Sequence, residues 1–151
     1  MENKVCFLFG HGTAPQTVGA DILSAAEKQY MQYHIRTFIV GNRGNFDRLA
    51  AAAIKVLKKR HGDITLLLLL SYPPFGRSAD IPQDFDNAYY PPIEVIPLPY
   101  AIVGANQYMI DHADSIICYV NKVGNTRNLL EYASRRTHIP ITNIAGGRDV
   151  K

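Results

Sequence analysis

The sequence predicts an α/β fold: a single doubly wound, Rossmann-like domain with a mostly parallel sheet of about five to six strands. Three observations predict it. Short β-rich runs alternate with longer stretches of helical period along the chain. The short runs are apolar throughout, which is typical of parallel strands that helices cover on both faces. The chain has 151 residues, a length that fits one domain, so we expect residues 1–151 to form it.

The first half of the chain supplies three strands and two helices. Val5 to Phe9 is a continuous apolar run that ends at Gly10, as a buried strand would. Apolar residues such as Val18 and Ile22 then recur at three- and four-residue steps, which predicts a helix. By the same criteria we expect strands at 5–9, 36–40 and 64–70 and helices at 15–33 and 46–60.

The second half begins with an irregular Pro/Tyr-rich segment at about 72–99. Five prolines fall between Ser71 and Pro92, and loops of this length are uncommon in compact domains and are often functional. We expect only a short strand near Val95 within this segment. The elements expected after it are helices at 100–112 and 126–136 and strands at 115–120 and 141–144.

The composition excludes several classes of protein. With 47% hydrophobic and 19% charged residues the chain is ordered and globular, and a net charge of +3 is too small to indicate nucleic-acid binding. The longest apolar run, 64–70, is far short of a membrane span, and we expect no signal peptide and a cytoplasmic location. Cys6 and Cys118 lie in apolar runs and are expected to pack in the core. The histidines share no metal-ligand spacing, so no metal site is expected.

Loops rich in glycine and asparagine follow the strands. In doubly wound sheets ligands bind beyond the carboxyl ends of the strands, and three of these loops lead directly into helix N-termini. Glycine lets the backbone approach a ligand, and a helix N-terminus favours an anion, so a phosphate-bearing nucleotide is the natural occupant. The candidate ligand-binding residues are Gly10, His11, Gly12, Thr13, Gly41, Asn42, Gly44, Asn45, Asp47, Ser71, Asn106, Gly124, Asn125 and Thr126.

Two well-known nucleotide motifs do not occur. The dinucleotide fingerprint would need a third glycine where Pro15 stands, and the second strand ends in Gly41 and Asn42 without a carboxylate for a ribose hydroxyl. A Walker motif is also missing from the sequence. Ordinary NAD dehydrogenases and P-loop NTPases are therefore disfavoured.

Four polar residues each leave two interpretations open. Asp47 either complements the dipole at the start of its helix, with Asn45 as the cap, or contacts a ligand, for which a ribose hydroxyl is the natural partner. His11 either donates to a phosphate or is exposed to solvent. Asn106 either points to the same edge of the sheet or lies on the surface. Glu131 is either a solvent-facing helical residue or a catalytic one.

At these loops the sequence resembles the SLOG superfamily, the Rossmann-like group that includes DprA and the LONELY GUY hydrolases, and above all its small YpsA-like branch. The branch pattern Phe-Thr-Gly-His-Arg corresponds to residues 8–12, with Gly12 in place of arginine. Its Gly-x-Ala-x-Gly-Phe-Asp loop corresponds to residues 41–47, with Asn45 in place of the second glycine. Later echoes are Asn106, Met109, Ile110 and Asp111, and Gly124, Asn125, Thr126, Tyr132 and Ala133.

The resemblance implies that these loops bind a nucleotide or a nucleotide derivative, with NAD- and ADP-ribose-related ligands among the candidates. It does not extend over about 72–99. Two family arginines are absent, because Gly12 and Ala105 replace them, and Leu129 stands where the LONELY GUY hydrolases have a glutamate. These departures make catalysis of the LONELY GUY type doubtful for this chain.

The leading hypothesis is a protein that senses or sequesters a nucleotide-derived ligand and requires no cofactor. One alternative is a hydrolase or transferase that acts on the N-glycosidic bond of nucleoside monophosphates, as LONELY GUY hydrolases or nucleoside deoxyribosyltransferases do, with Asp47 or Glu131 as nucleophile or general acid–base. A second alternative is a structural protein that binds a partner through segment 72–100. The expected partner is a small molecule rather than nucleic acid or a membrane, and a homodimer stays open.

Overall fold

The computed structural model describes residues 4–71, 85–93, 97, 100–136 and 138–146. Six strands and four helices are formed within these ranges. In chain order they are β1 (Lys4–Gly10), α1 (Val18–Tyr33), β2 (Ile35–Val40), α2 (Asn45–His61), β3 (Thr65–Leu69), β4 (Asn87–Tyr89), α3 (Tyr100–His112), β5 (Ser115–Tyr119), α4 (Asn125–Arg136) and β6 (Ile141–Asn143).

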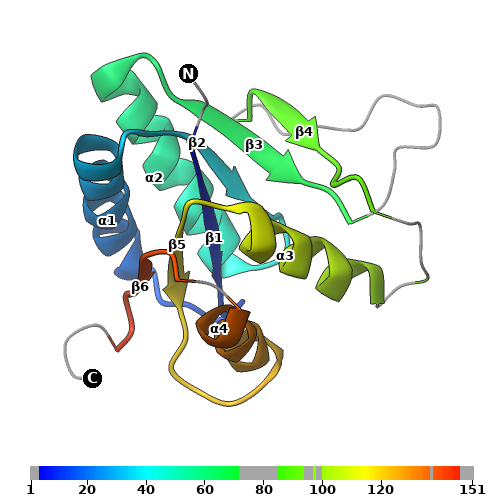
Figure 1. The fold of residues 1–151 in the computed structure, drawn as a ribbon. Helices are drawn as coiled ribbons and strands as arrows, with labels where there is room; N and C mark the ends of the chain where they lie inside the picture. The colour runs from blue at the N-terminus through cyan, green and yellow to red at the C-terminus, as the bar shows by residue number, and fades with distance from the viewer. Residues whose placement is uncertain (1–3, 72–84, 94–96, 98–99, 137, 147–151) are drawn as a thin grey trace.

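The strands form one six-stranded sheet in the order β4-β3-β2-β1-β5-β6, and every described pair is parallel (Figure 1). The chain moves outward from β1 to β4 and then returns to the other side of β1 for β5 and β6. The predicted doubly wound, Rossmann-like fold is thereby confirmed. The reversal places the topological switch point between β1 and β5, which is where such sheets bind ligands.

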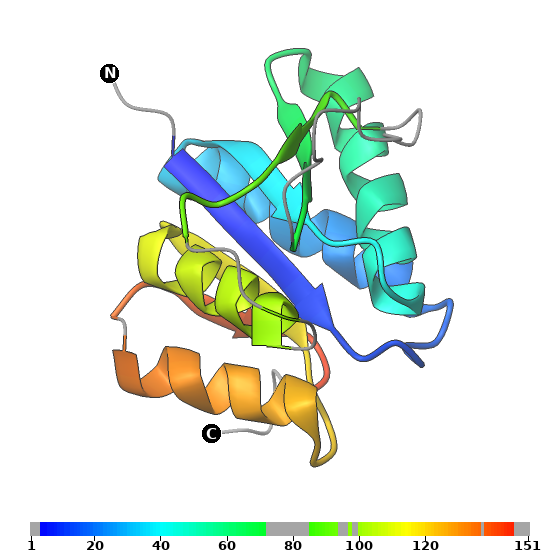
Figure 2. The same cartoon turned by 90° about the vertical axis from the view of Figure 1, so that its right-hand side faces the viewer.

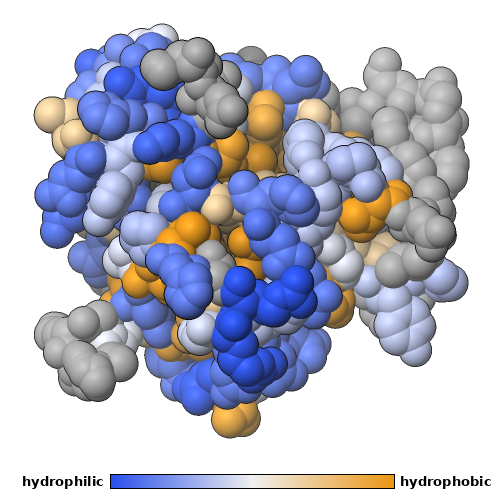
Figure 3. Space-filling view, viewed as in Figure 1, coloured by the Kyte–Doolittle hydropathy of each residue, from blue (hydrophilic) through white to orange (hydrophobic). Residues whose placement is uncertain are grey.

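Helices cover both faces of the sheet (Figure 2). Successive residues of a strand point to opposite faces, so Cys6 and Leu8 of β1 pack in the core cluster under α1 and α2. Phe7 and Phe9 pack in the second cluster, under α3 and α4. This two-sided burial explains why the strands are apolar without alternation. The face seen in Figure 3 is mostly hydrophilic, with hydrophobic patches between the polar side chains.

Both cysteines are fully buried, Cys6 in the first cluster and Cys118 in the second. Burial raises the pKa of each thiol to about 12, so neither thiol is deprotonated and reactive near neutral pH. The expected packing role of the cysteines is confirmed.

The strand β4 differs from the expectation for the irregular segment. The strand expected near Val95 lies outside the described residues, whereas Asn87–Tyr89 form β4 beside β3. Asp86 anchors this strand: its carboxylate accepts the Leu66 N–H at 2.7 Å, and its own N–H donates to the Leu66 carbonyl at 2.8 Å. Long-range pairing at the sheet edge, rather than an apolar pattern, therefore creates β4.

The helix α1 begins at Val18 and not at Pro15. The N–H groups of Val18 and Gly19 donate to the carbonyls of Pro15 and Gln16, so the expected first turn is a separate tight turn. The remaining boundaries agree with the prediction to within one residue, and α3 agrees at both ends. Among the described residues, no helix has the length and apolar character that a bilayer span requires.

Candidate functional site

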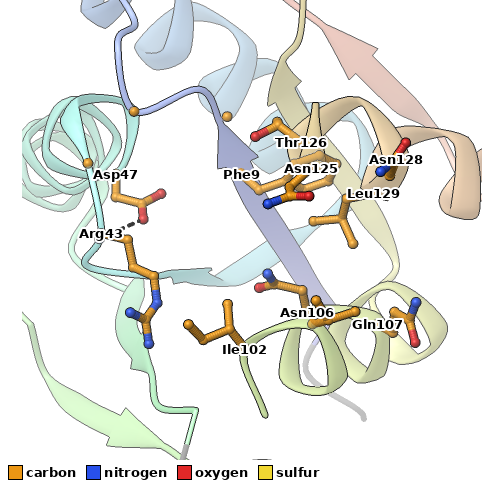
Figure 4. Close-up of a pocket in the computed structure, with 14 residues that line it drawn as sticks. Phe9, Arg43, Asp47, Ile102, Asn106, Gln107, Asn125, Thr126, Asn128 and Leu129 are labelled. Atoms are coloured by element: carbon orange, nitrogen blue, oxygen red, sulfur yellow. Dashed lines mark hydrogen bonds between the residues drawn. The ribbon is translucent and has the colours of Figure 1, made fainter. Parts of the chain in front are cut away.

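A pocket of about 440 Å³ opens at the carboxyl end of β1, at the switch point between β1 and β5 (Figure 4). Four segments meet there: the end of β1 and its loop, the start of α2, the first half of α3 and the first turns of α4. The lining residues are Phe9, Gly10, Gly12, Arg43, Gly44, Asp47, Ile102, Val103, Asn106, Gln107, Asn125, Thr126, Asn128 and Leu129.

Two glycine loops touch one another at the rim of this pocket. A Cβ on Gly44 would lie 2.5 Å from the Cα of Gly12, and the Asn45 N–H donates to the Gly12 carbonyl at 3.0 Å. Gly44 is extended, with φ of −169°, so close backbone approach and not unusual torsion demands glycine there. A Cβ on Gly10 would meet the buried ring of Phe46 at 2.5 Å. These glycines hold the loops together beside the pocket.

The role expected of Asn45 as helix cap is wrong, because Gly44 occupies the cap position and Asn45 is the first helical residue. The Asn45 side chain instead donates to the Ala14 carbonyl at 2.6 Å. Its oxygen accepts hydrogen bonds from Arg48 at 2.6 and 3.0 Å. Asn45 therefore ties the loop after β1 to α2 and is not among the described lining residues.

His11 is 6% exposed, so of its two interpretations the solvent-exposed one is wrong. Its ring Nε2 accepts the backbone N–H of Asn121 at 3.0 Å, and the backbone N–H of His11 donates to the Tyr119 carbonyl at 3.2 Å. Burial lowers the pKa of His11, and the positive charges of Lys122 and Arg127 lower it further. A neutral ring that accepts at Nε2 joins the loops after β1 and β5, and it does not line the pocket.

We expect NMR of labelled protein at pH 7 to find His11 neutral, with its proton on Nδ1, and to place its pKa below 6.5. The pKa of His11 is lower in the folded protein than in the unfolded chain. The stability that the neutral His11 ring contributes is therefore fully present above about pH 6.5 and is lost as pH falls through the folded pKa. The exposed His34 supplies a reference signal in the same spectra. A proton on Nε2 at pH 7 would contradict this arrangement.

Asp47 lies half-buried in the first turn of α2 and lines the pocket. Its Oδ2 accepts the backbone N–H of Arg43 at 3.0 Å, and a Cβ on Gly41 would lie 3.0 Å from the same oxygen. Burial raises the pKa of Asp47 to about 6, against the opposing effects of the Arg43 hydrogen bond and charge. A carboxyl group that titrates near neutrality in a pocket can bind a hydroxyl or exchange a proton.

The remaining walls combine amides with apolar side chains. Figure 4 shows the Asn106 amide of α3 and the Asn125 amide of α4 on the side of the open space that faces Arg43 and Asp47. Phe9, Ile102 and Leu129 supply apolar surface. Leu129 is 9% exposed and forms a buried part of this wall.

The structure brings together half of the predicted binding residues. Those that line the pocket are Gly10, Gly12, Gly44, Asp47, Asn106, Asn125 and Thr126. Those outside the described lining are His11, Thr13, Gly41, Asn42, Asn45, Ser71 and Gly124.

Two of the predicted residues outside the lining make hydrogen bonds near the pocket. Thr13 accepts a hydrogen bond from Lys122 at 3.1 Å. Gly124 has φ of +139° and its carbonyl accepts the Asn128 N–H at the start of α4. Asn42 is exposed on its loop, and Glu131 is exposed on α4, away from the described lining. The surface interpretation of Glu131 therefore fits its position.

Sequence reasoning missed the apolar wall and one cation. The missed lining residues are Phe9, Arg43, Ile102, Val103, Gln107, Asn128 and Leu129. Arg43 lies within a loop that the sequence predicted to bind a ligand, and its positive charge could have identified it as a partner for an anion. Across the part of the chain that the structure describes, no three His, Cys, Asp or Glu side chains gather in a way that could hold a metal ion.

Comparisons with known proteins add little to this geometry. No family model matches the chain, and no curated protein is similar to it in sequence. Among solved structures, a muconate lactonizing enzyme from Mycobacterium smegmatis matches 93% of this chain at 18% identity with a TM-score of 0.31. The match covers 32% of that enzyme, so this chain spans about a third of its length. A likeness at this level carries no argument about fold or function.

Proposed function

We propose that the protein binds a nucleotide or nucleotide-derived ligand, which it senses or sequesters, in the pocket at the β1–β5 switch point. The observation that carries this proposal is the convergence of two helix starts, those of α2 and α4, on one pocket that also contains Arg43. Helix N-termini and arginine both attract phosphate. The loop motifs that resemble the SLOG superfamily surround the same pocket, which supports the same conclusion.

The size and walls of the pocket also support a nucleotide. Its volume of about 440 Å³ is within the range of small-molecule sites. The apolar wall of Phe9, Ile102 and Leu129 fits a nucleobase, and the amides of Asn106 and Asn125 can read its polar edges. Asp47 is then the group for a ribose hydroxyl. NAD- and ADP-ribose-related compounds belong to the same ligand class.

Thermal unfolding tests this proposal. We expect AMP, ADP-ribose, NAD or a cyclic nucleotide to raise the melting temperature, by about 5–10 °C at a hundredfold excess over Kd. Val103→Trp should abolish the shift, because Val103 is 48% exposed and lines the pocket. Val56→Trp, at a valine that is 42% exposed and lies outside the described lining, is the control and should retain the shift. The absence of any shift at millimolar concentration would overturn the proposal.

The second candidate function is cleavage or transfer at an N-glycosidic bond, and the raised pKa of Asp47 favours it. Asp47 would then serve as nucleophile or general acid–base. Release of free base from AMP, measured in wild type and Asp47→Ala, separates this reaction from binding alone. Equal rates in the two proteins would remove Asp47 from any such mechanism.

Three other interpretations stay predictions. Most of segment 72–100, the proposed contact surface for a protein partner, lies outside the described residues. We also expect a cytoplasmic location, and a homodimer is compatible with the fold.

A further inference from the structure

The charges of the pocket are concentrated in one place. Of the described residues that line it, Arg43 is the one with a permanent positive charge and Asp47 the one with a carboxyl group. The other lining residues are amides, a hydroxyl, glycines and apolar side chains. Among the described lining residues, the full positive charge for an anionic ligand therefore lies in the loop between β2 and α2.

Arg43 is held in place by Ser71. An Arg43 terminal NH₂ group donates to the Ser71 Oγ at 2.8 Å, which spans from the loop after β2 to the residues after β3. Ser71 is 7% exposed, so this anchor is firm although Arg43 itself lies on the surface of a loop. The bond uses one of five N–H groups and leaves the others to bind a ligand. Fixing the side chain in advance reduces the entropy lost on binding.

Asp47 does not neutralise this arginine through its side chain. The Asp47 carboxylate accepts the backbone N–H of Arg43, and Figure 4 shows the Arg43 guanidinium group extending away from this carboxylate. The same view places Arg43 and Asp47 across the pocket from Asn125 and Thr126. The guanidinium group thus keeps its charge for a ligand that enters between these walls.

We propose that Arg43, positioned by Ser71, is the specificity-determining residue that makes this pocket select phosphorylated over unphosphorylated nucleosides. The guanidinium group pairs with phosphate oxygens in the bidentate geometry that suits it, and Ser71 acts through it as a positioning residue. This inference rests on the proposed function, because it names the group that recognises the phosphate of the proposed ligand.

The test is calorimetric titration of AMP and adenosine into the wild type and Arg43→Ala. In the wild type we expect AMP to bind at least about tenfold more tightly than adenosine, since a charge-assisted hydrogen bond to phosphate is among the stronger polar contacts. Arg43→Ala should weaken AMP binding by about tenfold or more and leave adenosine within about twofold. An unchanged preference for AMP in Arg43→Ala would overturn the inference while the proposed function stands.

Matched variants isolate the role of each residue. Arg136→Ala removes the same charge at the far end of α4, where Arg136 faces Asp111, and should leave the preference for AMP intact. Ser71→Ala should reduce the preference for AMP, and Ser71→Thr, which keeps the hydroxyl, should restore it. A lower melting temperature of Ser71→Ala with an unchanged AMP-to-adenosine ratio would assign Ser71 a structural role only and overturn its positioning role.

A second probe separates failure of this inference from failure of the proposed function. Inorganic pyrophosphate should shift the Arg43 Nε–H resonance in ¹H–¹⁵N spectra of the wild type. A shift with pyrophosphate, but no binding of AMP, would reject the nucleotide and retain Arg43 as a phosphate-binding residue. If neither probe binds, both proposals are overturned.

Discussion

Replacing Asp47 by asparagine is expected to stabilise the protein by about 2 kcal/mol at pH 7.5 and to leave its stability nearly unchanged at pH 4. The raised pKa of about 6 means that the folded state holds the Asp47 proton more tightly than the unfolded chain does. Ionising this carboxyl group therefore costs folding free energy. The amide of asparagine has the same shape and can still accept the Arg43 N–H, but it has no charge to bury.

The sign follows from the two pKa values. Between the ordinary value of 3.8 and about 6, the folded state binds more protons, so the free energy of unfolding falls as pH rises through this window. Above pH 6 the loss is complete. The other titrating groups are the same in both proteins, so they cancel when the variant is compared with the wild type at each pH. Urea unfolding at pH 4, 5, 6 and 7.5 measures the difference directly.

The matched control is Asp21→Asn, which changes an exposed aspartate in the first turn of α1. Loss of a charge that favours the helix dipole should destabilise the protein slightly, by about 0.3–1 kcal/mol at pH 7.5. The two variants thus have opposite signs. If Asp47→Asn were as destabilising as Asp21→Asn at pH 7.5, the Asp47 carboxylate would stabilise the start of its helix through its charge, and its burial would not cost folding free energy.

A residue that lowers stability and lies in a pocket is a candidate for function, because stabilising replacements at such sites tend to reduce activity. We therefore expect Asp47→Asn to bind the nucleotide more weakly while it folds more stably. A carboxylate can accept hydrogen bonds from two ribose hydroxyls, whereas the amide oxygen is a weaker acceptor. The opposite movement of stability and affinity would distinguish a ligand contact from a structural role.

The regular elements were predictable because local sequence determines them. The run Ser115–Tyr119 is apolar on both faces, and the helix Tyr100–His112 has its buried residues at helical spacing, so each element follows from its own residues. β4 was not predictable in this way, because Asn87–Tyr89 become a strand only through pairing with β3. Its anchor, Asp86, gives no local signal.

At the site, composition indicated the right loops but not the roles within them. Asn45 and His11 belong to residue types that often bind ligands, yet the Asn45 amide donates to the Ala14 carbonyl and the His11 ring accepts the Asn121 N–H. Those contacts join segments that are distant in the chain, such as His11 and Asn121. The periodicity of apolar residues in the sequence therefore does not predict them. The apolar wall was missed for a related reason: Phe9 and Leu129 have the pattern of core residues, and only the three-dimensional structure shows that they border a cavity.

Gly44→Ala should destabilise the protein by about 1–3 kcal/mol and abolish ligand binding. The added Cβ would lie 2.5 Å from the Cα of Gly12, and the obstacle is backbone that cannot rotate away. The loops after β1 and β2 must then separate, which breaks the hydrogen bond from the Asn45 N–H to the Gly12 carbonyl and widens the pocket rim. Thermal unfolding and nucleotide titration measure the two effects.

Gly12→Ala is the matched control, because it adds the same methyl group on the other side of the same contact. Its Cβ would lie 3.8 Å from the Cα of Gly44, an ordinary van der Waals distance. We therefore expect Gly12→Ala to fold with nearly wild-type stability, whereas Gly44→Ala does not. Equal melting temperatures for the two variants would contradict the tight contact between the loops. A stable Gly44→Ala that still binds its ligand would show that the rim can open without loss of the site, and the two glycine loops would then not form one rigid wall of the pocket.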